Sequence, residues 1–320
     1  MKPTQQKMQK RPKGGIAVGY ACSVRVIGMA TAACLLMSVV LPRAGAVSAS
    51  ASGSQQEATM QADTTGKLLE SGFNHLYELK FEAARTDFFA YQKARPEDPM
   101  GKAAESASYL FEQFNQKGVL TSEFFLSDQK FLGGVEGTAA QNANQRFLEA
   151  NEAARGMAKQ HLKSDPKNIR SLLVLTMVDG MESDYDALII KKQLAGLNMM
   201  KQAEAEANTL LAVDNSMQDA NVALGMSNYV IGCLPSYKRA FLLFGGMHGD
   251  RTRGMQQMDS AAQRGHYFKP FAEVMLALAY EREHDNASAQ KLLAQLAEAY
   301  PENPVFSREL ELVNKKMGRV

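Results

Sequence analysis

From Met60 to the carboxyl terminus, apolar residues recur three or four positions apart, with polar residues between them. This spacing is that of an amphipathic helix, which buries one face against a partner. Between Leu68 and Pro96 it occurs twice, once through Leu68, Leu69, Phe73, Leu76 and Tyr77 and again through Phe81, Ala84, Phe88 and Tyr91. Pro96 ends the second series because proline has no N–H to donate. The stretch therefore predicts two helices joined by a tight turn.

The second helix of this unit has a spacing that recurs along the chain. A small residue is followed four positions later by a packing residue, three later by another, and five later by a stop, as in Ala84, Phe88, Tyr91 and Pro96. The same spacing is found in Ala154, Ala158, His161 and Pro166; in Ala203, Ala207, Leu210 and Asn215; in Gly254, Met258, Ala261 and His266; and in Ala289, Leu293, Leu296 and Pro301. Small residues let two helices pack closely. The pattern predicts about five helix pairs, and Asn303 begins a last helix that caps the stack.

The spacing between the stops also predicts where the repeat is interrupted. Successive stops are about one 34-residue period apart, plus insertions. Two insertions coincide with breaks in the pattern, at residues 118–137, which are bracketed by glycines, and at 232–248, which contain Leu234-Pro235 and Gly245-Gly246. No break is visible in residues 168–213, so we expect longer helices there.

Gly72 and Ala277 add a second small residue twelve positions before Ala84 and Ala289, where the first helix of a pair crosses the second. Leu276, Ala277 and Tyr280 match the L-G-x₂-Y pattern of the tetratricopeptide repeat (TPR), with alanine in place of glycine and without the family's tryptophan. The chain thus resembles the TPR superfamily. The resemblance implies an all-α fold, an α-solenoid of about five TPR-like helix pairs in residues 60–320, with insertions and a C-terminal capping helix.

The resemblance also implies where a partner binds, because the first helix of each TPR pair lines the concave face. The concave-face residues it indicates are Leu69, Phe73, Tyr77, Val222, Met226 and Tyr229. They predict an apolar groove for a helix or an extended segment of another protein. The alternative is that these side chains pack inside the array.

Residues 1–46 differ from the rest of the chain. They contain seven basic residues and no acidic one, and an apolar run from Val26 to Leu41 leads to Ala44-Gly45-Ala46. This order is typical of a secretory signal peptide, followed here by a flexible linker at 47–59. An uncleaved anchor and a lipoprotein that uses Cys34 are the alternatives. We expect an exported protein of the bacterial periplasm or envelope.

Removal of the leader changes the charge and the cysteine content. The whole chain has 36 basic and 34 acidic residues, so the loss of seven basic ones leaves a formal charge of −5. This balance argues against a nucleic-acid partner. Cys233 remains as the one cysteine, which excludes an internal disulfide and suggests a buried apolar role.

No familiar catalytic or metal-binding motif is present, and we predict no enzyme and no cofactor. The five histidines, His75, His161, His248, His266 and His284, have no metal-ligand spacing and are interpreted as packed or solvated. The glycine-rich residues 245–254 lack the Lys-Ser/Thr of a phosphate loop, so we interpret Asp250 as the N-cap of the next helix. Three acids, Glu182, Asp184 and Asp186, suggest either a cation site or, as we prefer, the start of a helix.

Residues 229–246 are unusual because Lys238 and Arg239 precede an apolar run. They are similar to a segment of the eukaryotic mitochondrial outer-membrane and inclusion-body-clearance TPR proteins. The many methionines nearby suit either core filling or a surface for varied apolar partners. The leading hypothesis is a non-catalytic adaptor or scaffold for another protein. The alternative is a membrane-associated assembly component that contacts a bilayer or a partner through residues 232–248.

Overall fold

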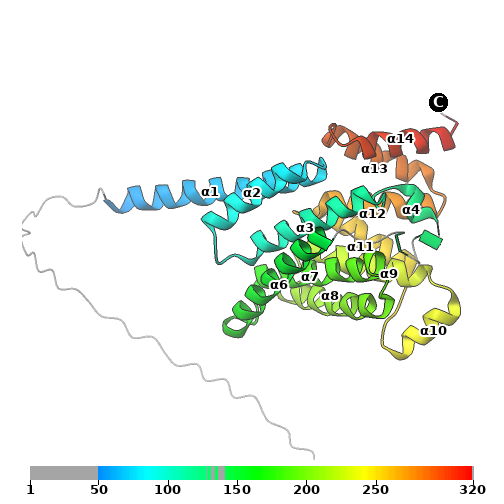
Figure 1. Cartoon of the computed structure of the whole chain (residues 1–320), viewed down its shortest axis with the longest axis horizontal. Coiled ribbons are helices and arrows are strands. Elements are labelled where there is room, and N and C mark those ends of the chain that lie inside the picture. The colour runs from blue at the N-terminus through cyan, green and yellow to red at the C-terminus, as the bar shows by residue number, and fades with distance from the viewer. Residues whose placement is uncertain (1–49, 128, 131–133, 136–140, 319–320) are drawn as a thin grey trace, which may run out of the picture. The chain divides into compact units, whose positions relative to one another are not determined.

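The computed structural model describes residues 50–320, except 128, 131–133, 136–140 and 319–320. Within these residues all regular secondary structure is helical, as predicted. Five TPR-like helix pairs follow one another: α1 (Ser50–Tyr77) with α2 (Phe81–Ala94), α3 (Pro99–Gln116) with α6 (Gln141–Ser164), α7 (Ile169–Asp184) with α8 (Gln193–Val213), α9 (Asn221–Cys233) with α11 (Arg251–Arg264), and α12 (Lys269–Arg282) with α13 (Asn286–Ala299). A last helix, α14 (Pro304–Lys316), packs on α13 (Figure 1).

The spacing found in the sequence marks the buried side of each second helix. Its small and packing positions are buried in every repeat except at His161, which is half-buried. All five predicted stops, Pro96, Pro166, Asn215, His266 and Pro301, lie two residues beyond the last residue of a helix. The sequence therefore located the end of each second helix to within the one or two residues by which assignments of helix ends differ.

Small residues lie at the predicted helix crossings. A Cβ on Gly72 would approach the ring of Phe88 to 2.3 Å, so α1 and α2 pack at this distance only with glycine. In the fourth pair, a Cβ on Gly254 would lie 2.6 Å from the backbone nitrogen of Tyr229 and 2.7 Å from the carbonyl oxygen of Gly225. These backbones cannot move aside as a flexible side chain can, so Gly254 sets the approach of α11 to α9.

The two predicted insertions contain short helices. The first holds α4 (Ser122–Leu126), which packs on α12, and the second holds α10 (Ser236–Phe244). Asp250 caps α11 as predicted, because its side chain accepts a hydrogen bond from the backbone N–H of Arg253 at 3.0 Å. Asn303 likewise caps α14.

The third pair has the long helices that were expected, and α8 has 21 residues. The acids of this pair were interpreted wrongly, however. Glu182 and Asp184 lie at the end of α7 and Asp186 lies in η1, a π-helical turn (Tyr185–Ile189), so none of them begins an α-helix. No residue pattern indicated the π-turn, through which the chain leaves α7 before α8 begins at Gln193.

Contacts between distant repeats join the first pair to the last. The hydroxyl of Tyr77 donates to the backbone carbonyl of Tyr267 at 2.9 Å, and the side-chain amide of Asn303 donates to the carbonyl of Tyr77 at 2.7 Å. Lys80, in the turn between α1 and α2, forms an ion pair with Glu302 at 2.7 Å. The array is thus closed upon itself by contacts between its two ends, as well as stacked between neighbours.

The predicted leader, residues 1–46, lies outside the described residues. Helix α1 begins at Ser50, within the stretch 47–59 expected to be a linker, and its side chains are described from Thr64 onward. None of the helices described here combines the length and the hydropathy needed to cross a bilayer.

Candidate binding site

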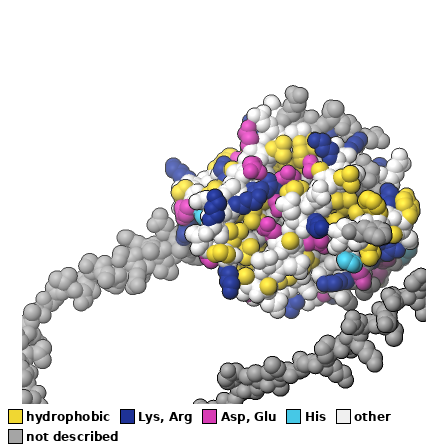
Figure 2. All heavy atoms as spheres, turned by 90° about the horizontal axis from the view of Figure 1, so that it is seen from below, with side chains coloured by type: hydrophobic (Ala, Val, Ile, Leu, Met, Phe, Trp, Pro, Cys, Tyr) yellow, Lys and Arg dark blue, Asp and Glu magenta, His cyan; other side chains and the backbone are white. Residues whose placement is uncertain are grey.

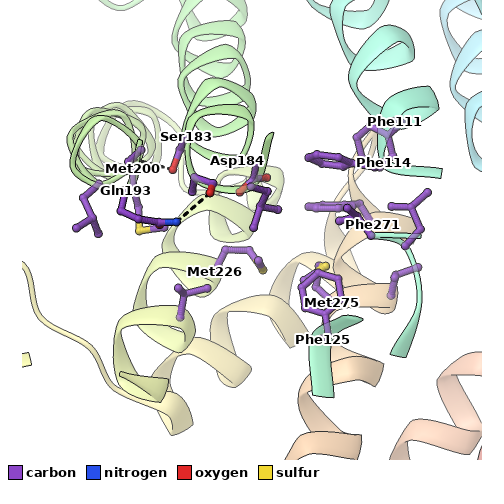
Figure 3. A pocket seen from close by; sticks show the side chains of 18 of the residues that line it. Phe111, Phe114, Phe125, Ser183, Asp184, Gln193, Met200, Met226, Phe271 and Met275 are labelled. Carbon is purple, nitrogen blue, oxygen red and sulfur yellow. Dashed lines mark hydrogen bonds between the residues drawn. The ribbon is translucent and has the colours of Figure 1, made fainter. Parts of the chain in front are cut away.

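The concave side of the array encloses a cavity of about 590 Å³. The first helix of each pair contributes to its wall, together with α8, α14 and the insertion helices α4 and α10. The apolar side chains come from every repeat, among them Leu76, Phe111, Phe114, Leu197, Met200, Met226, Val230, Phe271 and Met275 (Figure 3). The volume lies within the range of small-molecule sites, which are commonly apolar with a few polar groups.

The mouth of the cavity carries exposed apolar side chains. Leu194, at the start of α8, and Tyr237 and Phe241, on α10, line the cavity and are 72%, 72% and 71% exposed. We call these three the rim residues. Tyr237 and Phe241 are four positions apart, so they lie on one face of α10. The amino group of Lys201 donates to the carbonyl of Gly245 at 2.7 Å, which ties the end of α10 to α8.

Hydrophobic side chains are not confined to the rim. Figure 2 views the molecule from the side on which α8 and α10 lie, and hydrophobic side chains form several patches there with Lys and Arg between them. Most large apolar residues elsewhere are buried; the exposed ones on other elements, such as Phe89 and Leu312, are less exposed than the rim residues. The rim is therefore the most accessible concentration of large apolar side chains that line a cavity.

Few polar groups face the cavity, and most of them already have partners. Ser183 donates to the carbonyl of Gly196 at 2.9 Å, and Gln193 donates to that of Ala187 at 3.0 Å. Asn303 donates to Tyr77, as described above. Lys238 is exposed at the mouth.

Asp184 differs from these groups. Its carboxyl lines the cavity, and no residue that the structure describes forms a hydrogen bond or an ion pair with it (Figure 3). Burial alone raises the pKa of Asp184 to about 7, since no neighbouring charge or donor offsets the loss of water. Asp184 ends α7 immediately before the π-turn, and π-turns are frequent at functional sites.

The predicted concave-face residues have different positions. Tyr77 and Met226 line the cavity, while Phe73 and Val222 line a smaller one of about 110 Å³ that shares Tyr77, Asp184 and Met226 with it. Leu69 and Tyr229 are buried between helices. The later repeats cover some of these side chains, because the ring of Phe73 lies 5.3 Å from that of Tyr267. Their role in binding a partner stays a prediction, and only those that line a cavity face open space.

Sequence reasoning named residues 232–248 as a contact segment and Asp184 as one of three acids at a possible cation site, but it placed neither beside a cavity. The signal for the rim was present, because residues 229–246 stood out as basic and apolar. The signal for Asp184 was not, because an acidic residue at the end of one helix looks the same as one at the start of the next.

Other candidate chemistry is explained by ordinary packing. Cys233 is buried, and burial raises the pKa of its thiol. His75 lies 3.0 Å from the carboxylate of Asp87, and His266 packs against the ring of Tyr267. Within the described part of the chain, no group of three or more His, Cys, Asp or Glu side chains is placed to hold a metal ion.

No protein-family model matches the chain, and no curated protein matches it. Among solved structures, the chain is similar to the crystal structure of a thermophilic TPR protein from Thermus thermophilus. The two are 15% identical in sequence, and the match covers 78% of this chain and 98% of the other, with a TM-score of 0.43.

Proposed function

We propose that the protein is an exported, non-catalytic adaptor of the bacterial envelope that binds a segment of another protein at the rim of its central cavity. One observation carries the proposal: Leu194, Tyr237 and Phe241 are largely exposed although each also lines the cavity. An apolar segment of a partner would bury these side chains from water, and aromatic residues beside a pocket are common anchors in protein interfaces. Export is proposed from the basic and apolar pattern of residues 1–46.

The test is capture of partners from envelope extract with the mature chain. The double variant Tyr237→Ser and Phe241→Ser removes two anchors, and we expect it to lose at least about 10-fold in captured partner. Leu312→Ser is the matched control, because Leu312 is an exposed leucine on α14 that does not line the cavity. Equal capture by the double variant and the control would refute the rim as the binding site.

Export has a separate test. Expression of the whole chain in a bacterium, followed by fractionation and mass determination, should give a periplasmic product that begins near residue 47. A full-length product in the cytoplasm would contradict export without bearing on the rim.

A second candidate function follows from α10. Lys238 and Arg239 lie beside Tyr237 and Phe241 on this short helix, and cationic and aromatic groups together favour anionic membrane surfaces. Flotation with vesicles that contain an anionic phospholipid distinguishes the candidates. Under the adaptor proposal the protein stays with the soluble fraction, whereas flotation that the double variant abolishes would favour the membrane-associated role.

A further inference from the structure

The interior of the cavity has a polar feature that the rim residues lack. The carboxyl of Asp184 faces a space whose walls are largely aromatic, aliphatic and methionine side chains (Figure 3). The side chain of Asp184 is half-buried, and its carboxyl is costly to ionise because no donor makes up for the water that burial removes. In most structures a buried carboxyl has a partner. The missing partner of Asp184 is what a bound molecule can supply.

The other polar groups of the wall restrict the chemistry of that molecule. Ser183, Gln193 and Asn303 use their donor groups on backbone carbonyls. The hydroxyl of Ser183 has no further hydrogen to donate, and the amides of Gln193 and Asn303 each keep one hydrogen but carry no positive charge for an anionic head group. Lys238 is the one basic residue among the described lining, and it is exposed at the mouth. The described interior therefore offers negative charge and no free cation.

From the volume, the apolar walls and the unpartnered carboxyl together, we infer that the cavity binds an aliphatic amine, a molecule with one cationic amino group and an unbranched hydrocarbon body. The amino group donates to the carboxylate of Asp184, forming a charge-assisted hydrogen bond in a setting of low dielectric constant. The hydrocarbon body lies among Phe111, Phe114 and Phe271, which it shields from water. The volume of about 590 Å³ suits such a small molecule.

The inference is independent of the adaptor role, because it concerns the interior of the cavity and not the exposed surface of the rim. A protein segment docked on the rim would close the mouth above the amine. A variant that loses amine binding can therefore still be tested for capture of a partner protein, and the reverse.

Calorimetric titration of the purified mature chain with decylamine, decanol and decanoate at pH 8, each below its micelle concentration, tests the proposal. The three probes share one hydrocarbon body and differ in charge. We expect decylamine to bind at least about 10-fold more tightly than decanol, because a charge-assisted hydrogen bond is stronger than a neutral one. Decanoate should bind most weakly.

Asp184→Asn should remove the preference for decylamine and leave the affinity for decanol nearly unchanged. Asp186→Asn is the matched control, since Asp186 is two residues away in the π-turn and does not line the cavity. It should bind all three probes as the wild type does. Met226→Trp fills part of the cavity, so this variant should weaken every probe, with circular dichroism confirming that it is folded.

Three results would overturn the inference. They are decanoate binding as tightly as decylamine, an amine preference that survives Asp184→Asn, and no measurable binding of any probe by the folded wild type. If decanoate binds and Lys238→Gln abolishes this binding, the polar head instead lies at the mouth.

Discussion

The hydroxyl of Tyr77 lies 2.9 Å from the backbone carbonyl of Tyr267, although 190 residues separate them in the chain. The ring of Tyr77 also packs against Tyr300, with 5.6 Å between the ring centroids. Most TPR arrays have contacts only between neighbouring repeats. Here the first repeat contacts the last, and Tyr77 and Asn303 from the two ends both line the cavity.

Asn303 contacts Tyr77 and also caps α14. Its replacement should therefore weaken both the contact between the two ends of the array and the start of the last helix. Its amide donates to the carbonyl of Tyr77 at 2.7 Å, and its side-chain oxygen accepts from the backbone N–H of Val305 at 2.9 Å. We expect Asn303→Ala to lower the free energy of unfolding by about 2–3 kcal/mol, measured by urea denaturation. Asn303→Ser keeps an N-cap acceptor and loses the longer amide, so it should cost about half as much. Equal stability of both variants and the wild type would contradict the closure argument.

Gly254 and Gly156 provide a matched pair of helical glycines. A Cβ at Gly254 would meet the backbone of α9, whereas one at Gly156 on α6 would meet no atom within 4 Å. Gly254→Ala should therefore destabilise the protein by about 2 kcal/mol or more, because the helices must separate. Gly156→Ala should stabilise it by about 0.4–1 kcal/mol, since alanine favours the helix. Thermal denaturation of both variants measures this, and a stabilising Gly254→Ala would show that α11 can move.

Arg155 joins three acids between the second and third pairs, of which Asp179 is buried and Glu152 is exposed. Its guanidinium donates to Asp179 at 3.0 Å and also to Glu152 and Glu182. Arg155→Met would leave the carboxylate of Asp179, which is nearly inaccessible, without its cationic partner. We expect a loss of about 3–5 kcal/mol in the free energy of unfolding. The double variant Arg155→Met and Asp179→Leu should recover part of this loss; a double variant less stable than Arg155→Met alone would contradict the explanation.

Carboxyl groups with raised pKa values, among them Asp184 and Glu206, should make the protein less stable as the pH rises from about 4 to 7. Burial raises the pKa of Asp184 to about 7, and burial together with the charge of Asp179 raises that of Glu206 to about 7. Between their unfolded and folded pKa values the native state binds more protons than the unfolded state, so the free energy of unfolding decreases with increasing pH. Asp184→Asn removes one of these groups. It should gain about 1 kcal/mol or more at pH 8 relative to the wild type, allowing for water in the cavity.

Denaturant titrations at pH 4.5 and pH 8 measure the effect. Glu298→Gln is the control here, because Glu298 is exposed on α13 and does not line the cavity. A wild type and an Asp184→Asn variant with the same difference in stability between the two pH values would contradict the assignment.

Much of the fold could be predicted because it depends on local spacing. Ala84, Phe88 and Tyr91 recur as a pattern because the second helix of each repeat packs in the same way. Prolines follow three of these helices, where a residue without an N–H cannot continue the helix. Phe73 shows the limit of this reasoning. Its apolar spacing predicted a buried or partner-facing side chain equally well, and Tyr267 covers it through a contact that no local pattern encodes. Asp184 and its neighbouring acids were placed at the start of a helix because no residue pattern indicated the π-turn that follows α7.

The meeting of Tyr77 with Tyr267 has a consequence for how such a chain can evolve. Open solenoids gain or lose repeats by duplication, because each copy needs only its neighbours. If the first and last repeats must touch, the number of repeats between them is fixed. Inserting or deleting one helix pair here would pull the ends apart and open the interior to water, so the number of copies is constrained even where their sequences diverge.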